Sequence, residues 1–137
     1  MTDSRAEMPI FAKTYDFLAW LVPLTNNFPR AQRHAVTQRL LDAGLSFLER
    51  LVDANAVRGA DRLKLLDAAD AELDKVRLYL RLAHRWRWIT PGQYEHASRL
   101  IAELGRLLGG WQKTTRQQSA SGIPSGGPAT SSVAGAG

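Results

Sequence analysis

The amino-acid sequence predicts an all-α protein, an antiparallel four-helix bundle, and two observations carry this prediction. Apolar residues recur at steps of three and four along four segments, which is the spacing that lines one face of a helix. No segment of useful length alternates apolar and polar residues as a half-buried strand does. Short connections join the segments, so neighbouring helices are expected to run in opposite directions. With 137 residues, the chain is long enough for one ordinary domain with one core.

The first two helices are expected on either side of the polar turn TNNFP. Steps of four, three and four predict one face of the first helix: Phe11, Tyr15, Leu18 and Val22. Pro23 is expected to end that helix, and Pro29 suits the first position of the next one. The second helix carries two neighbouring apolar stripes, the first of Leu40, Ala43, Phe47, Leu51 and Ala54 and the second of Leu41, Leu45, Leu48 and Val52.

The third and fourth helices have clearer start signals. In RGAD, Gly59 can leave the second helix and Asp61 can cap the third. In ITPGQ, Thr90 is predicted as the N-cap of the fourth helix, Pro91 as its first residue and Gln93 as the second half of a capping box. Each helix has a predicted apolar seam, which comprises Leu66, Ala69, Leu73, Val76, Leu80 and Ala83 in the third and Tyr94, Ala97, Ile101, Leu104, Leu108 and Trp111 in the fourth.

Composition divides the chain into three parts. Residues 1–8 are expected to form a flexible N-terminus and residues 9–111 the four-helix bundle. Gly109 and Gly110 should weaken the end of the fourth helix. Residues 112–137 hold many Gly, Ser and Pro and few large apolar side chains, so they cannot bury enough surface to offset their ordering entropy. They are predicted to be a disordered tail.

The predicted bundle has more apolar surface than one seam can bury. A second stripe on the third helix comprises Leu65, Ala68, Tyr79, Leu82 and Trp86. Each large apolar side chain contributes about 1.5–3 kcal/mol when it is buried, so such stripes can drive self-association into a homo-oligomer. A wider core in a monomer explains them equally well, and the residues leave both readings open.

Catalysis finds no support in the residues. The chain has no cysteine, and His34, His84 and His96 fall on three different predicted helices without the spacing of metal ligands. No glycine-rich phosphate loop is present either. We therefore expect no enzymatic activity, no metal and no cofactor. An enzyme whose site forms between subunits is the one catalytic alternative.

The sequence also indicates where the protein resides. No apolar run approaches the roughly 20 residues of a membrane span. The start of the chain lacks the basic and then apolar layout of a secretory signal, and a chain without cysteine suits a reducing compartment. A soluble cytoplasmic protein that does not bind membranes is expected.

Charge is unevenly distributed along the chain, whose formal net charge is +5. Residues 1–74 hold nine basic and eleven acidic side chains, whereas residues 75–137 hold nine basic and two acidic ones. This asymmetry predicts an anionic partner. The alternative is a lopsided surface charge that serves only solubility.

The stretch RLYLRLAHRWRW, residues 77–88, concentrates the basic charge. At about 100° per residue, its polar face comprises Arg77, Arg81, His84, Arg85 and Trp88. Trp86 is expected on the opposite, apolar side. Asp74 can pair with Arg77, but Arg81 and Arg85 have no acid three or four residues away. Their counter-charge should therefore come from outside the helix.

Two kinds of partner would supply that charge. Phosphates suit the planar donors of arginine, with Trp88 as a stacking surface for a base. A carboxylate-rich protein surface would serve as well, and the residues do not separate the two. Arg87 in the same stretch, and Arg30 and Arg33 at the start of the second helix, are candidate additions to the site.

Four phrases carry a resemblance to a known family: YDFLAWLVPLTNNFPRAQR at 15–33, TQRLLDA at 37–43, LVDANA at 51–56 and LRLAHRWRWITPGQYEHASRLIAELGRLLGGW at 80–111. The chain resembles the S23-type four-helix bundles of ribosomal RNA intervening sequences. Within them it is most similar to the accessory variability determinants of diversity-generating retroelements. The resemblance covers roughly residues 8–111.

The resemblance implies a homopentameric, barrel-shaped or ring-shaped assembly with a basic surface and central channel. It also implies partners, namely RNA, DNA and the reverse transcriptase of the same element, which makes mutagenic complementary DNA from a template RNA. The accessory protein would do no chemistry itself. By position in the helix, the family's interaction surface would map onto Arg77, Arg81, Arg85 and Arg87, with His84 nearby.

Three hypotheses follow. The first is an accessory subunit that binds nucleic acid and reverse transcriptase, and it predicts binding that weakens steeply with salt. The second is an S23-type bundle that acts only as a protein–protein adaptor and has no affinity for nucleic acid. The third is an enzyme with a site between subunits.

Overall fold

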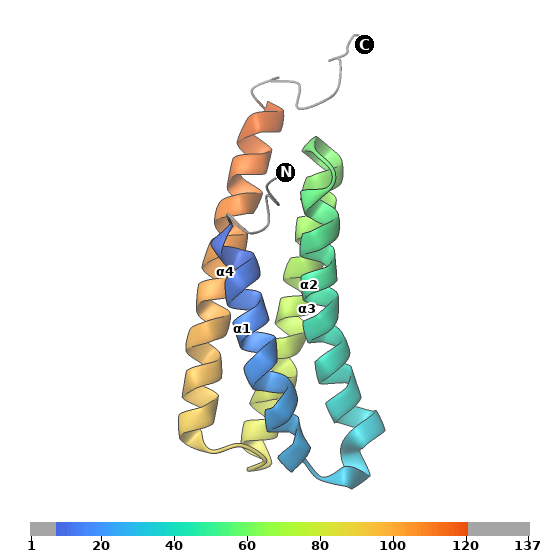
Figure 1. Cartoon of the computed structure of the whole chain (residues 1–137), viewed down its shortest axis with the longest axis vertical. Helices are drawn as coiled ribbons and strands as arrows, with labels where there is room; N and C mark the ends of the chain where they lie inside the picture. Colours follow the sequence, from blue (N-terminus) through green and yellow to red (C-terminus); the bar gives the residue numbers. More distant parts are fainter. Residues whose placement is uncertain (1–7, 121–137) are drawn as a thin grey trace.

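The computed structural model describes residues 8–120, and four long helices dominate that part of the chain. They are α1 (Pro9–Leu24), α2 (Gln38–Asn55), α3 (Gly59–Arg85) and α4 (Pro91–Ala120). The helices lie side by side along the long axis and alternate in direction (Figure 1). Within residues 8–120 no strand occurs, so the predicted four-helix bundle is confirmed.

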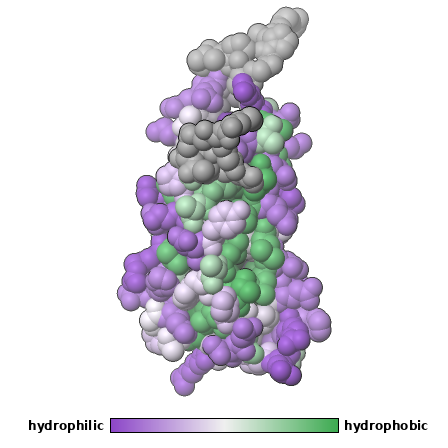
Figure 2. Space-filling model, in the orientation of Figure 1, coloured by the Kyte–Doolittle hydropathy of each residue, from purple (hydrophilic) through white to green (hydrophobic). Residues whose placement is uncertain are grey.

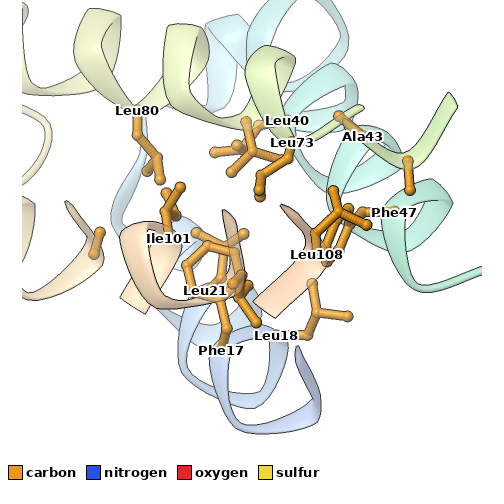
Figure 3. Packing of buried hydrophobic residues seen from close by; sticks show 14 of the residues in the cluster. Phe17, Leu18, Leu21, Leu40, Ala43, Phe47, Leu73, Leu80, Ile101 and Leu108 are labelled. Carbon is orange, nitrogen blue, oxygen red and sulfur yellow. The ribbon is translucent and has the colours of Figure 1, made fainter. Parts of the chain in front are cut away.

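The core lies along the middle of the bundle, and the predicted seams of α2 and α3 form much of it. All five residues of the first α2 stripe and all six of the α3 seam are buried. From α4, the buried members of the predicted seam are Ala97, Ile101, Leu104 and Leu108. Figure 3 shows leucines of α2, α3 and α4 converging on Phe17 and Leu21 of α1. These seams were found because their spacing persists over several turns.

The buried face of α1 matches the predicted one at Phe11 and Leu18, which are buried, but not at the other two positions. Tyr15 is 59% exposed and Val22 is 42% exposed, whereas Phe17 and Leu21 are buried. Thr14 joins the buried face because its hydroxyl donates a hydrogen bond to the Ile10 carbonyl at 2.6 Å, which satisfies the polar group. The helix is apolar on nearly every side, so its sequence does not determine which face is buried.

The connection between α1 and α2 is more irregular than predicted. Pro23 lies inside α1, which ends one residue later at Leu24, and a 3-10 turn follows at Thr25–Asn27. Pro29 is extended, with a ψ of 131°, rather than the first residue of a helix. The chain then winds through a 3-10 turn (Arg30–Gln32) and a π-helical turn (Arg33–Thr37) before α2 begins at Gln38.

The connection between α2 and α3 is held by an arginine rather than by the predicted cap. Gly59 has a φ of 61° and is the first residue of α3, and Arg58 occupies the N-cap without a side-chain hydrogen bond. The predicted capping by Asp61 is therefore wrong, although its charge lies in the first turn. Arg62 donates from Nε to the Ala54 carbonyl at 3.0 Å and so satisfies the end of α2. Burial and the neighbouring Arg58 lower the pKa of Arg62.

The start of α4 matches the prediction, but its end does not. The Gln93 N–H donates to Thr90 Oγ1 at 3.0 Å, and the Thr90 N–H donates to Gln93 Oε1 at 2.9 Å, which is the predicted capping box. The helix continues to Ala120, so the prediction of a tail from residue 112 onward is wrong for residues 112–120.

Contacts made by the last turns of α4 explain this extension. Gln112 is buried and donates from Nε2 to Asp67 Oδ1 of α3 at 2.9 Å. The buried Thr115 donates to the Trp111 carbonyl at 2.7 Å. The predicted flexible N-terminus, except for Met8, and residues 121–137 of the predicted tail lie outside the described part. No helix of residues 8–120 is both long and apolar enough to span a bilayer.

Candidate functional site

Two connections meet at one end of the bundle, where α1 leads into α2 and α3 leads into α4 (Figure 1). Phe28 of the first connection is buried and packs against Trp88 of the second, with ring centroids 5.3 Å apart. This contact joins segments that are far apart in the sequence. It places Arg30 and Arg33 at the same end of the molecule as the arginines that follow Leu80.

This end carries nearly all of the excess positive charge. Segments 17–41 and 75–94 together contain eight Lys and Arg and no Asp or Glu, a net charge of +8. The remainder of the chain holds ten basic and thirteen acidic residues, a net charge of −3, which accounts for the total of +5. We call the following side chains the basic end: Arg30, Arg33, Arg81, His84, Arg85, Trp86, Arg87 and Trp88.

The arginines of the basic end have no acidic partner. Arg30, Arg33, Arg81, Arg85 and Arg87 are exposed, and no ion pair joins them to an acid within residues 8–120. By contrast, five of the twelve other Arg and Lys of residues 8–120 pair with an acid a turn away, as Arg99 does with Glu95, and Lys13 pairs with Glu103 of α4. The absence of acids over the α3 terminus was predicted, and the structure extends it to the facing connection.

Arg77 differs from the other predicted site residues. Its guanidinium pairs with Asp74, as the three-residue spacing predicted. Its Nη2 also lies over Gly105 of α4, where an added Cβ would approach it to 2.7 Å. Arg77 therefore lies near Gly105 of α4 and has part of its charge neutralised by Asp74, so it contributes less to the site than Arg81 and Arg85.

The two tryptophans lie together rather than on opposite sides. Helix α3 ends at Arg85, and Arg87 adopts a φ of 63°, so the periodicity of 100° per residue does not extend to Trp88. The rings of Trp86 and Trp88 are 5.0 Å apart at 41°. Trp88 is half-buried, and Trp86, predicted on the apolar side, is 47% exposed. The stacking surface predicted for Trp88 is thus offered mainly by Trp86.

A groove runs along the basic end. It has a volume of about 680 Å³ and is lined by Arg81, His84, Arg85, Arg87, Trp88, Ile89, Thr90 and Pro91. The His84 ring stacks on Tyr94 of α4, with centroids 4.3 Å apart and planes at 2°. Tyr94 thus holds one wall of the groove in place. Sequence reasoning assigned Tyr94 to the core, because its spacing matches the α4 seam.

The remaining histidines lie elsewhere. His34 is exposed on the α1–α2 connection, with Nδ1 3.2 Å from Gln38 Oε1, and His96 packs edge-on against Trp20 with centroids 5.0 Å apart. Among residues 8–120, no cluster of three His, Cys, Asp or Glu side chains has the geometry of a metal site.

Comparisons with known proteins agree with this architecture. The model of the bAvd-like family matches residues 8–115, which include the whole basic end. A solved structure of a protein of unknown function from the S23 ribosomal protein family, from Bacteroides thetaiotaomicron, aligns with a TM-score of 0.69 at 23% identity. That alignment covers 76% of this chain and 95% of the other, and it supports the fold. Curated proteins yield no match.

Proposed function

The chain belongs to the bAvd-like family of accessory variability determinants, and from this we propose that it is a non-catalytic subunit of a diversity-generating retroelement. In this role it binds the template RNA or its complementary DNA through the basic end. It also binds the reverse transcriptase of the same element, a separate chain that performs the mutagenic synthesis. The protein acts in the cytoplasm, where that synthesis takes place.

The absence of acids at the basic end carries this proposal. Arginine offers a planar set of donors that matches the oxygens of a phosphate. Exposed arginines four residues apart, such as Arg81 and Arg85, repel each other slightly unless an anion lies between them. Nucleic acid supplies a row of such anions and releases counterions when it binds, which strengthens binding at low salt.

Self-association is the second part of the proposal. Figure 2 shows apolar surface over the region where α1 and α2 meet. Leu45 of α2 is 44% exposed and Val22 of α1 is 42% exposed, and Leu41, Leu48 and Val52 of α2 are only half-buried. A single chain therefore leaves the second α2 stripe partly in water, which supports assembly over a wider monomeric core. We propose a homo-oligomer, a ring or barrel of five copies as the resemblance implies.

Fluorescence anisotropy with a labelled structured RNA and a matched DNA tests the binding role. The affinity is measured at several salt concentrations, and the logarithm of the dissociation constant is plotted against the logarithm of the salt concentration. For the double variant Arg81→Glu/Arg85→Glu, we expect binding to be abolished or its salt slope to fall by about 1.4–1.8, because each lost phosphate contact removes about 0.7–0.9. Circular dichroism and size-exclusion chromatography should show unchanged folding and assembly.

The matched control is Lys64→Glu/Arg116→Glu. Both side chains are exposed and lie toward the opposite end of the bundle, and the change in net charge is the same. We expect this variant to bind more tightly than the Arg81/Arg85 variant. Equal losses in both would mean that net charge alone attracts nucleic acid. If the wild type fails to bind even at low salt, the protein is a protein–protein adaptor and the basic end docks carboxylates.

A further inference from the structure

The aromatic side chains of the basic end form a short series that ends in solvent. Phe28 is buried, Trp88 is half-buried against it, and Trp86 rests on Trp88 with 47% of its surface exposed. A ring that rests on another ring by one side keeps its other face free for a stacking partner. One side of the Trp86 ring packs against Trp88, which in turn packs against Phe28. The exposed part of the Trp86 ring is therefore available to a partner.

Two exposed arginines, Arg85 and Arg87, are the neighbours of Trp86 in the chain. Both also line the groove of the basic end, whose aromatic wall is Trp88, the ring that Trp86 contacts. Arg87 has a φ of 63°, a left-handed conformation that L-residues other than Asn and Asp rarely adopt. The backbone therefore leaves the helical path directly after α3. The turn thus carries one exposed aromatic ring between two exposed arginines in the chain, neither of which pairs with an acid within residues 8–120.

From this arrangement we propose that the basic end binds single-stranded nucleic acid, or unpaired nucleotides of a folded RNA, by stacking one base on Trp86. The inference rests on the proposed nucleic-acid role and specifies its ligand. In a duplex each base already stacks on its neighbours, so a tryptophan on a convex surface reaches no base without unstacking the helix. In a single strand the base faces are free, and stacking on an aromatic ring is largely independent of sequence.

The test compares a short fluorescein-labelled oligothymidylate with the same strand annealed to its complement. Binding of each probe is measured by anisotropy for the wild type, Trp86→Ala, Trp86→Phe and the control Tyr15→Ala, an exposed aromatic residue on α1. Trp86→Ala should weaken single-strand binding roughly 5- to 150-fold, the usual effect of removing one stacked base, and leave duplex binding unchanged. Trp86→Phe should retain most of the affinity, and Tyr15→Ala should match the wild type.

The salt dependence separates this inference from the proposed function. Because Trp86 contacts no phosphate, the salt slope of Trp86→Ala should equal that of the wild type, whereas the slope of the Arg81/Arg85 variant falls. Salt-dependent binding that is insensitive to Trp86→Ala would overturn the stacking proposal alone. Equal loss of single-strand and duplex binding would also overturn it, since Trp86 would then support the conformation of the basic end and not stack on a base. Absence of binding to either probe would overturn the proposed function itself.

Discussion

Three glycines in the helices offer a direct measure of how α1 and α4 pack. Replacing a glycine in a helix interior by alanine stabilises the helix by about 0.5–1 kcal/mol when the added methyl group meets nothing. Gly109 meets this condition, because no heavy atom lies within 4 Å of a Cβ built there. Gly109→Ala should therefore raise the free energy of unfolding by that amount and serves as the reference.

The other two glycines face neighbours of different kinds. A Cβ at Gly44 would lie 3.0 Å from Leu18 Cδ2, which is packed in the core. Overpacking a core costs about 1–3 kcal/mol, so Gly44→Ala should be less stable than Gly109→Ala by that amount. A Cβ at Gly105 would lie 2.7 Å from Arg77 Nη2, but this is the end of a flexible, half-exposed side chain that can swing outward. Gly105→Ala should stay within about 1 kcal/mol of Gly109→Ala, the upper value of an exposed ion pair.

Urea denaturation followed by circular dichroism measures these differences. All variants must be compared at one protein concentration, because the stability of an oligomer depends on it. The free energies are comparable when the dependence of the unfolding free energy on urea concentration is the same for all variants. If Gly44→Ala were as stable as Gly109→Ala, α1 would not rest on α2 at this point. If Gly105→Ala were the least stable of the three, Arg77 would be fixed between the helices and not free to move.

Three further substitutions test other elements of the bundle. Thr90→Ala should lower stability by about 0.5–2 kcal/mol in urea denaturation because it removes the acceptor of the Gln93 N–H, and Thr90→Ser should restore it. Leu80→Asp should lower the free energy of unfolding by at least about 3 kcal/mol in the same assay, because it buries a charge. The control Leu78→Asp, at a position 51% exposed, should fold. A folded Leu80→Asp protein would contradict the assigned face of α3. The Arg62 guanidinium lies over the Trp111 ring of α4, with Cζ 5.6 Å from the ring centroid, in addition to its bond to the Ala54 carbonyl. Arg62→Ala should lower the thermal midpoint, and Arg62→Lys should fail to restore it because lysine cannot reproduce both contacts.

The parts of the fold that sequence reasoning found are those with local signals. The α3 seam repeats over many turns, so its phase is determined by many positions at once. The start of α4 depends on Thr90, Pro91 and Gln93, which lie within four residues of one another. In α1, by contrast, FLAWLVPL offers almost no polar residue that would show which side faces water. The buried side is decided by what α2 and α4 present to it.

The basic end was found in part for the same reason. The unpaired Arg81 and Arg85 follow from helical spacing, which is local. The position of Trp86 does not, because no glycine or proline marks the end of α3 and the left-handed turn at Arg87 has no sequence signal. The predicted antiparallel topology places the connections before α2 and before α4 at one end, and with them Arg30 and Arg33. The contact between Phe28 and Trp88 depends on tertiary packing, so the sequence did not indicate it.

The placement of charge at the helix ends argues that the basic end serves a partner and not the stability of the bundle. The helix dipole favours bases near a C-terminus and acids near an N-terminus, each by about 0.3–1 kcal/mol and only within the terminal turn. Arg85 fits this preference, since it is the last residue of α3. Arg33 is the first residue of the helical turn that leads into α2, where an acid would be favoured instead, whereas Arg30 and Arg87 lie outside the first turns of α2 and α4.

The helix dipole would therefore favour an acid at position 33, and it gives no reason for an arginine at positions 30 and 87. The bundle tolerates this cost at an end where two segments together contain no acid at all. Repulsion among these arginines adds to the cost in the free protein, and a bound polyanion removes both contributions at once. Replacing Arg30 and Arg33 by glutamate should accordingly leave the bundle as stable or more stable while it weakens nucleic-acid binding. A loss of stability without a loss of binding would show that these arginines serve the fold.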